Sequence, residues 1–299
     1  MADPFDGYGA ALRDDHLLPM AAAVWSSPPA DSAMQPAASF IRFCDNHGLL
    51  KISGRPVWRT VSGGSREYVS RLTERFADRI HTGRAVLAVN RLGSGVRLRT
   101  AQGVHTYDHV VLACHADQAL ALLGAGATQR EHSVLGAFRY TRNLAVLHTD
   151  ASLMPKRRRV WSSWNYLGRS GTQDARPCVT YWMNRLQSLK GDTQYFVTLN
   201  PPRPPRAGTL LRSETYEHPV FDAAATRAQR HLWSLQGNGG VWFCGAHFGA
   251  GFHEDGLQAG LAVAEQLGGV RRPWDVANES GRIHVTVTEH GDAALEASA

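Results

Sequence analysis

Apolar and polar residues alternate along three short stretches between residues 85 and 107. The stretches are 85–89, 96–99 and 105–107, and the segments Gly93-Ser-Gly and Gln102-Gly separate them. Alternation puts successive side chains on opposite faces of a strand, and short glycine-containing segments between strands favour hairpin turns. The pattern therefore predicts a three-stranded antiparallel meander.

A second group of short apolar stretches lies between residues 130 and 216, with glycine, proline and aspartate in the intervening loops. These stretches are 143–148, 160–166, 178–183, 195–199 and 210–216. Short strands with turn residues between them are typical of an antiparallel sheet. The stretch 108–114 is apolar without alternation, which is typical of a strand buried in a parallel sheet.

Apolar residues with helical spacing occur in the first 50 residues and again after residue 220. The apolar residues of the first helix are Leu12, Leu17, Leu18 and Met20. A loop is expected at 26–37, and a second helix should end at His47-Gly48, because glycine commonly follows the last helical residue. Two more helices are expected, one through residues 68–76 and one over 221–235.

The stretch 241–267 combines a strand, a glycine-rich loop and a helix. Residues 241–244 are apolar, Gly245 begins the loop, and Glu254 and Asp255 open a segment with helical spacing. Carboxylates in a first helical turn are favoured by the helix dipole. The free N–H groups of such a helix start suit an electron-rich ring edge or an oxyanion, and an ordinary helix cap explains the pattern equally well.

The composition is that of an ordinary globular protein, with 43% hydrophobic and 19% charged residues. The best candidate for a membrane span, 17–25, is too short and contains Pro19, so no integral membrane segment is expected. The first residues lack the basic and apolar regions of an export signal, which indicates a cytoplasmic protein. The four cysteines are scattered and form no C-x-x-C pair, as expected for reduced thiols.

The net charge of +6 raises the question of nucleic-acid binding. The one dense basic run is Lys156-Arg-Arg-Arg, and no nucleic-acid motif accompanies it. Such a basic loop is usually a solvated turn, so we expect no nucleic-acid partner. Neither H-E-x-x-H nor a C-x-x-C pair is present, and we expect no metal site.

Two segments of the 241–267 stretch resemble a known motif. Phe243-Cys-Gly-Ala, followed by Gly251-Phe-His-Glu-Asp-Gly-Leu-Gln-Ala-Gly, is similar to the C-terminal flavin-binding motif of the flavin-dependent amine oxidase and phytoene desaturase superfamily. Other phrases, among them Pro56-Val-Trp-Arg-Thr-Val-Ser-Gly-Gly-Ser, resemble one branch of it: the bacterial NAD/FAD-binding oxidoreductases often encoded beside cyclopropane fatty-acid synthases. The resemblance covers most of residues 8–282.

The resemblance implies FAD as the cofactor and an α/β fold with an α+β substrate part. In this superfamily the helix amides lie against the pyrimidine edge of the isoalloxazine, and the backbone at the position of Val86 meets the adenine. The cofactor-binding residues predicted in this way are Gly63, Gly64, Val86, Gly245, Glu254, Asp255, Gly256 and Leu257.

The resemblance also implies a domain organisation in which an incomplete FAD-binding domain with a parallel sheet adjoins an antiparallel substrate domain. The expected parts are a helical part of the substrate domain (1–55), an FAD-binding portion (56–125), the antiparallel substrate domain (126–236), the C-terminal FAD-binding strand, loop and helix (237–270), and a tail (271–299).

Aromatic residues are concentrated in the expected antiparallel sheet. They include Trp161, Trp164, Tyr166, Tyr181 and Trp182. This is more than one half-exposed sheet face ordinarily carries, so we expect these residues to face the flavin and line a pocket for a small apolar substrate. Ordinary sheet packing is the alternative interpretation for about half of them.

The dinucleotide fingerprint of this superfamily is not found in the sequence. In G-x-G-x-x-G the glycines let the backbone approach the pyrophosphate, and none of the G-x-G segments at 7–9, 93–95, 124–126, 237–239 and 249–251 has the third glycine. The central strand of the parallel sheet would then be missing, which predicts a gap between 108–114 and 241–244. We expect either a fragment or a second chain that supplies the missing FAD half.

Two departures from the family pattern bear on the chemistry. Ala246 stands where many relatives have an acidic residue that bonds the ribityl chain, and none of the three lysines matches the lysine of amine oxidases. No catalytic residue can be named, because His115, His247 and His253 near the motif are each expected to be structural.

Two hypotheses follow from these patterns. The first is an FAD-dependent oxidoreductase that acts on an apolar, lipid-derived substrate; the flavin performs the hydride transfer, so a missing acid or base does not argue against an enzyme. The alternative is a truncated non-catalytic fragment, or a partner-dependent subunit that cannot hold FAD alone.

Overall fold

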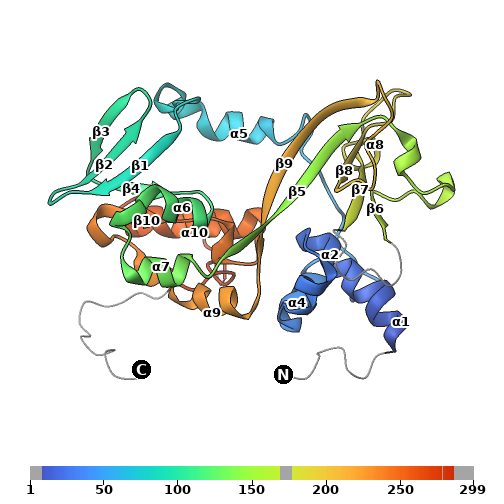
Figure 1. Ribbon diagram of the computed structural model, residues 1–299, viewed down its shortest axis with the longest axis horizontal. Helices are drawn as coiled ribbons and strands as arrows, with labels where there is room; N and C mark the ends of the chain where they lie inside the picture. The colour runs from blue at the N-terminus through green and yellow to red at the C-terminus, as the bar shows by residue number, and fades with distance from the viewer. Residues whose placement is uncertain (1–8, 169–176, 278, 286–299) are drawn as a thin grey trace. The chain divides into compact units, whose positions relative to one another are not determined.

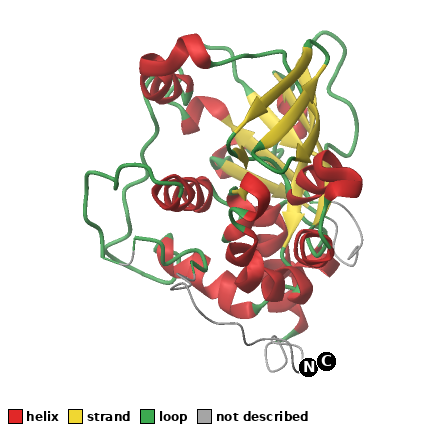
Figure 2. Cartoon of the chain, turned by 90° about the vertical axis from the view of Figure 1, so that its left-hand side faces the viewer, coloured by secondary structure: helices red, strands yellow, loops and turns green. Residues whose placement is uncertain are grey.

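The computed structural model describes residues 9–168, 177–277 and 279–285, and the chain divides into two compact units. The first consists of Met1–Gly83 and Arg139–Ala223, and the second of Arg84–Phe138 and Ala224–Ala299. Helices and strands occur in both units, and the expected α/β class with an α+β part is confirmed. Figure 2 shows the helices and strands of the chain. Each unit is assembled from two separate parts of the chain. The five-part division expected from the sequence stays a prediction.

A five-stranded antiparallel sheet forms the first unit's core (Figure 1). Its strands, in spatial order, are β6 (Trp164–Leu167), β7 (Cys178–Trp182), β8 (Phe196–Leu199), β5 (Arg139–His148) and β9 (Leu210–Val220). All four pairings between neighbours are antiparallel. Val146, Val179 and Phe196 are buried in this core. The spaced strands between residues 130 and 216 therefore form the predicted kind of sheet.

The start of β6 differs from the expected 160–166. Arg158–Val160 form a 3-10 helix, and the strand begins only at Trp164. The side-chain oxygen of Asn165 accepts a hydrogen bond from the Ser162 N–H at 3.0 Å, which ties the preceding backbone into a turn. A side chain that bonds to nearby backbone competes with strand pairing, and this shortens the strand.

Short helices make up the N-terminal part of the first unit. They are α1 (Ala10–Leu12), a π-helix (Arg13–Leu17), α2 (Leu18–Trp25), α3 (Pro29–Ala33), α4 (Ala37–Asn46) and α5 (Arg66–Thr73); α8 (Met183–Leu186) follows β7. Helix α3 lies inside the expected loop 26–37, and it begins with Pro29, where the missing proline N–H costs no helical hydrogen bond. Trp25 packs against Phe43 with ring centroids 5.7 Å apart. Gly48 follows α4 with a φ of +64°, as predicted.

The second unit contains the predicted meander. β1 (Val86–Arg91), β2 (Val96–Thr100) and β3 (Gly103–Tyr107) pair in that order, and both pairings are antiparallel. A register shift between Val86 and Ala88 places a bulge at the start of β1. Every residue of β3 is exposed, so this strand is an open edge of the sheet.

A two-stranded parallel sheet lies at the base of the predicted strand, loop and helix. β4 (Val110–Leu112) is hydrogen-bonded directly to β10 (Val241–Phe243), and the Cys244 N–H donates to the Leu112 carbonyl at 3.2 Å. The prediction of a gap between these strands is therefore wrong. Backbone groups left open by a gap would need other partners, and direct pairing satisfies one edge of each strand. Burial of β4 is only partial, because Val111 is 39% exposed.

Four α-helices lie in the described part of the second unit. They are α6 (Ala116–Leu123), α7 (Gln129–Leu135), α9 (Ala223–Leu232) and α10 (His253–Gln266). Helix α6 contacts both α7 and β1. Arg91 of β1 donates to the buried carboxylate of Glu131 in α7, which also caps its own helix by accepting from the Thr128 N–H at 2.7 Å. These contacts fix the meander against the helices.

Candidate functional site

The carboxyl ends of β4 and β10 lie at the same edge of the parallel sheet. β4 leads through Cys114 and His115 into α6, and β10 leads through Cys244 and Gly245 towards α10. In sheets of this kind ligands bind beyond the carboxyl ends of the strands, where the loops and the helix N-termini meet. This edge is therefore the candidate site of the second unit.

Gly245 has a backbone conformation that favours glycine. Its φ is +150°, and a Cβ at this position would lie 2.9 Å from Nδ1 of His247 and 3.5 Å from the carbonyl oxygen of Cys114. A side chain here would meet both strand ends at once, and the conformation itself is strained for any other residue. Glycine at 245 thus lets the chain turn sharply from β10 into the loop.

Gly256 brings the first turn of α10 close to that loop. A Cβ at Gly256 would lie 3.7 Å from the Ala246 nitrogen and 4.0 Å from the Gly245 carbonyl carbon, which are ordinary contact distances. The chain's own packing therefore does not require glycine at 256. A residue without a side chain at the exposed start of a helix leaves room for a close ligand.

The first turn of α10 has open backbone amides and a buried carboxylate. Asp255 is fully buried, and its Oδ2 accepts from the N–H groups of Ala250 at 3.0 Å and Phe252 at 2.8 Å. In the described part of the chain, the amides of His253 and Glu254 have no acceptor. The Asp255 side chain thus organises the loop, while the two open amides supply the positive end of the helix dipole.

His247 is held neutral beneath the loop. Burial, and to a lesser degree the nearby His115, lowers the pKa of His247 to about 4. Its ring packs against Phe138 at 5.3 Å and Phe248 at 5.0 Å, and its Nε2 finds no hydrogen-bond partner among the described residues. A neutral imidazole between aromatic rings contributes to packing, and the structural role expected for His247 stays a prediction.

The thiols of the cysteines at this edge are unreactive because burial raises their pKa values. Burial raises the pKa of Cys244 to about 11, with a smaller contribution from Cys114, and burial also raises the pKa of Cys114. In the first unit, burial raises the pKa of Cys178 to about 11. The thiolate is the nucleophile, and these thiols are protonated at neutral pH.

We therefore expect Cys178 and Cys244 to resist alkylation by iodoacetamide at pH 8 while the protein is folded. Mass spectrometry of the labelled protein measures this, and the same protein unfolded in guanidinium serves as the control in which all four cysteines react. Rapid native labelling of Cys244 would contradict the burial of this strand end.

The remaining predicted cofactor residues are distributed between the two units. Val86 is half-buried at the bulge that begins β1, and Leu257 is 52% exposed on α10, both in the second unit. Gly63 and Gly64 belong to the first unit, where both have positive φ angles of +82° and +88° in the turn before α5. Their roles towards a cofactor stay predictions.

The five predicted pocket aromatics lie on both faces of the antiparallel sheet. Directly opposed residues share a face and successive residues alternate, so the pairing of Trp164 with Tyr181 places these two, together with Tyr166, on one face. Trp182 follows Tyr181 and lies on the other face, where its ring contacts Trp161 at 5.4 Å. The structure therefore brings the five together as two groups.

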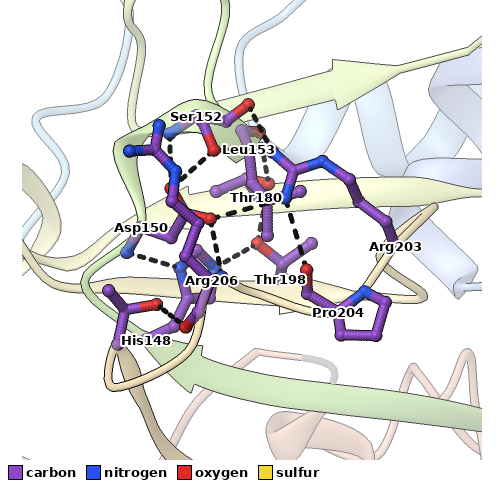
Figure 3. A network of polar contacts seen from close by, with 10 residues as sticks. His148, Asp150, Ser152, Leu153, Thr180, Thr198, Arg203, Pro204 and Arg206 are labelled. Carbon is purple, nitrogen blue, oxygen red and sulfur yellow. Dashed lines mark hydrogen bonds and ion pairs between the residues drawn. The ribbon is translucent and has the colours of Figure 1, made fainter.

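A buried polar network on the sheet was missed by the sequence patterns (Figure 3). Nδ1 of His148 accepts from the Asp150 N–H at 3.1 Å, so Nε2 carries the proton and donates to Thr198 Oγ1 at 2.7 Å. The Thr198 hydroxyl lies 2.9 Å from that of Thr180, which donates onward to the Leu153 carbonyl. Burial lowers the pKa of His148, with Asp150 opposing, which agrees with this neutral tautomer. A single threonine inside each of two apolar strands, Thr180 in β7 and Thr198 in β8, was the available signal.

Asp150 connects this network to the loop between β8 and β9. The carboxylate is 3% exposed and accepts from the Ser152 N–H at 2.9 Å and the Arg206 N–H at 3.0 Å. Guanidinium nitrogens of Arg203 and Arg206 lie 3.5 Å and 3.3 Å from its oxygens. Burial raises the pKa of Asp150, but the hydrogen bonds from Ser152 and Arg206 lower it more, so the net pKa is well below its usual range.

Other kinds of site find less support in the described residues. A cavity of about 560 Å³ lies within the tail and is lined by Arg271, Glu279 and Ile283 among others, but by none of the predicted cofactor residues. Within the described ranges, no group of three or more His, Cys, Asp and Glu side chains could hold a metal ion. No described helix is both long and apolar enough to cross a membrane.

Comparison with known proteins supports a flavin family for the chain. A family model described as flavin containing amine oxidoreductase matches residues 9–163, just over half of the chain. A search of the curated proteins finds no match.

Solved structures show a similar fold. The chain is similar to a protein assigned as a protoporphyrinogen oxidase from Exiguobacterium sp. 255-15, with a TM-score of 0.56, 13% identity, and coverage of 87% of this chain and 64% of that one. It is also similar to cyclohexylamine oxidase from Brevibacterium oxydans IH-35A (TM-score 0.55, 14% identity, 87% and 65% coverage). A third similar structure is a CLA-producing fatty acid isomerase from P. acnes (TM-score 0.52, 13% identity, 76% and 57% coverage). The chain thus spans less than two thirds of each of these proteins, and at these identities the likeness concerns the fold alone.

Proposed function

Because the chain belongs to the family of flavin containing amine oxidoreductases, we propose that it forms the flavin-facing part of an FAD-dependent oxidoreductase with an apolar, lipid-derived substrate. The observation that carries this proposal is the start of α10 at the carboxyl edge of β4 and β10. There, the open amides of His253 and Glu254 lie beside Gly256, where the chain's own packing leaves room for a ligand. These features fit the pyrimidine edge of an isoalloxazine ring.

The chain's own residues bind and orient the cofactor in this proposal. FAD, when bound, would accept the hydride from the substrate. The amides at the start of α10 favour electron density at the ring edge that they face, and Leu257, which follows Gly256, offers an exposed apolar side chain. Val86 would meet the adenine end through its backbone. The low pKa of His247 leaves it without a charge, so it would add no positive charge near the ring.

An apolar substrate is supported by the aromatic sheet of the first unit. Trp164 and Tyr166 are 43% and 37% exposed on one face, and Tyr181 lies on that face beside Trp164. Adjacent exposed aromatic groups are a common feature of binding surfaces. The second group, Trp161 and Trp182, packs against Phe196 and takes a structural role.

A partner-dependent subunit is the second candidate, favoured by the missing fingerprint. No G-x-G segment of the chain has the third glycine of the pyrophosphate-binding turn, and Ala246 offers no acid for the ribityl chain. The residues present therefore fit the flavin end of FAD better than its phosphates. In this case a second polypeptide supplies the phosphate-binding half, and the isolated chain holds less than one FAD.

Equilibrium dialysis of the purified chain against FAD and against riboflavin tests both candidates. Riboflavin has the isoalloxazine but no phosphate or adenine, so we expect the chain to bind FAD at most about tenfold more tightly than riboflavin. A complete pyrophosphate site contributes several charge-assisted hydrogen bonds of about 1.5 to 3 kcal/mol each, and it would favour FAD by a factor of about a thousand or more.

Two outcomes of this experiment would count against the proposals. If the chain binds neither flavin, the flavin-facing role of α10 is wrong. If it is isolated with one tightly bound FAD and discriminates strongly against riboflavin, the chain contains a phosphate site of its own and the partner-dependent candidate fails.

A further inference from the structure

The glycine loop before α10 is held in place by one buried carboxylate. Oδ2 of Asp255 accepts from the N–H groups of Ala250 and Phe252, at either end of the loop's last turn. A Cβ at Gly249 would lie 2.5 Å from Oδ1 of the same residue, so glycine at 249 makes the space that the carboxylate occupies. The position of the loop therefore depends on the position of the Asp255 side chain.

This carboxylate has a guanidinium partner from the tail that follows α10. Nε of Arg282 donates to Asp255 Oδ1 at 2.6 Å, and the Arg282 backbone N–H donates to the side chain of Gln258 at 3.2 Å. Asp255 is fully buried, and the Arg282 side chain is 30% exposed. A buried carboxylate needs hydrogen bonds and a counter-charge, and two backbone N–H groups supply only the first.

A second arginine of the tail holds the opposite end of the same helix. Arg272 is 7% exposed and makes two side-chain hydrogen bonds to Glu265, at 2.7 Å and 2.9 Å. Its backbone N–H also donates to Glu265 at 3.0 Å. The tail is thus attached to α10 at the last turn by Arg272 and at the first turn by Arg282, and only the second attachment involves the glycine loop.

We propose that Arg282 is a positioning residue for the cofactor: through Asp255 it holds the glycine loop and the first-turn amides of α10 where the flavin ring is received. The inference rests on the proposed function for its cofactor part, while its effect on the loop is independent of any ligand. Without Arg282 the buried carboxylate loses its counter-charge and is no longer held in place on that side. Its hydrogen bonds to Ala250 and Phe252 are then weakened, and the loop is released.

Arg282→Gln and Arg272→Gln form a matched pair of variants. Each removes one guanidinium that joins the tail to α10, so both lower the thermal stability of the protein. Hydrogen exchange of the Ala250 and Phe252 amides, followed by NMR without flavin, measures the loop directly. We expect Arg282→Gln to raise both exchange rates about tenfold or more, and Arg272→Gln to leave them within about twofold of wild type.

Flavin affinity, measured by equilibrium dialysis with riboflavin, tests the cofactor part. We expect about tenfold weaker riboflavin binding by Arg282→Gln, wild-type binding by Arg272→Gln, and intermediate binding by Arg282→Lys, which restores the charge but not the planar geometry of the guanidinium.

Each outcome tests one part of the proposal about Arg282. Unchanged exchange at Ala250 and Phe252 in Arg282→Gln overturns the proposal at its base. Raised exchange with unchanged riboflavin affinity overturns the positioning role and leaves a structural ion pair. If wild type binds no riboflavin at all, the proposed function fails, and the exchange data still decide whether Arg282 holds the loop.

Discussion

Gly256→Pro is expected to weaken flavin binding by at least about a hundredfold. The Gly256 N–H donates to the Phe252 carbonyl at 3.3 Å in the first turn of α10. Proline removes this donor, and its ring clashes with the carbonyl four residues earlier, which costs about 3 kcal/mol or more and distorts the turn. At about 1.4 kcal/mol per factor of ten, an energy of this size corresponds to about a hundredfold in affinity if the displaced amides face the ring as proposed. Equilibrium dialysis with riboflavin measures the affinity, and circular dichroism confirms that the variant is folded.

Two alanine variants distinguish an effect of the distorted helical turn from an effect of a side chain that blocks access of the flavin to α10. Both Gly256→Ala and Gly260→Ala fit the chain's own packing, since the nearest atom to a Cβ is 3.7 Å away at 256 and none lies within 4 Å at 260. Both should stabilise the helix by up to about 1 kcal/mol, because glycine is a poor helix former. Only Gly256→Ala should weaken flavin binding. Equal flavin affinity in all three variants and wild type would show that the ring does not approach α10.

Asp150→Asn is expected to lower the free energy of unfolding of the first unit by about 2 to 4 kcal/mol at pH 7. The substitution keeps the shape of the side chain but removes the charge that pairs with Arg203 and Arg206 and weakens the hydrogen bonds from Ser152. The estimate lies below that for a fully buried pair, because both arginine side chains are about half or more exposed. Urea unfolding followed by circular dichroism measures the difference.

The pH dependence of this difference has a definite sign. The folded pKa of Asp150 lies below the unfolded value of about 3.9, so the stabilisation is complete above about pH 4 and is lost as the pH falls through the folded pKa. The gap between wild type and Asp150→Asn should therefore be constant from pH 7 to pH 5 and shrink below about pH 4. Glu217→Gln, which removes a partly exposed partner of Arg142 in the same sheet, is the control and should change stability little. A gap that widens on acidification would contradict the depressed pKa.

The local periodicity of apolar residues predicted most of the secondary structure. The alternation at 85–107 became β1, β2 and β3, the spaced stretches of 130–216 became the antiparallel sheet, and the strand, loop and helix of 241–267 became β10 and α10. The exceptions have local causes. The Asn165 side chain accepts a hydrogen bond from the backbone before β6, and Pro29 begins a helix inside the expected loop.

The candidate site was only partly accessible to the same reasoning. The resemblance located Gly245 and Gly256, and the structure gives both a physical reason in the sharp turn after β10 and the open start of α10. It also predicted that Asp255 binds the cofactor, which stays a prediction; the structure shows that the carboxylate of this residue points inward and holds the loop. A helix start can use an acidic residue in either way, and the spacing is the same for both.

The sequence by itself determined the elements, the flavin family and the glycine turn, because each depends on residues within a few positions of one another. Tertiary structure alone decided the direct pairing of β4 with β10, the division of the aromatic residues between two sheet faces, and the partners of Asp150 and Asp255. Arg206 lies 56 residues from Asp150 and Arg282 lies 27 from Asp255. Such pairs form because a buried charge takes whichever counter-charge the packed chain brings to it, and no local pattern encodes that choice.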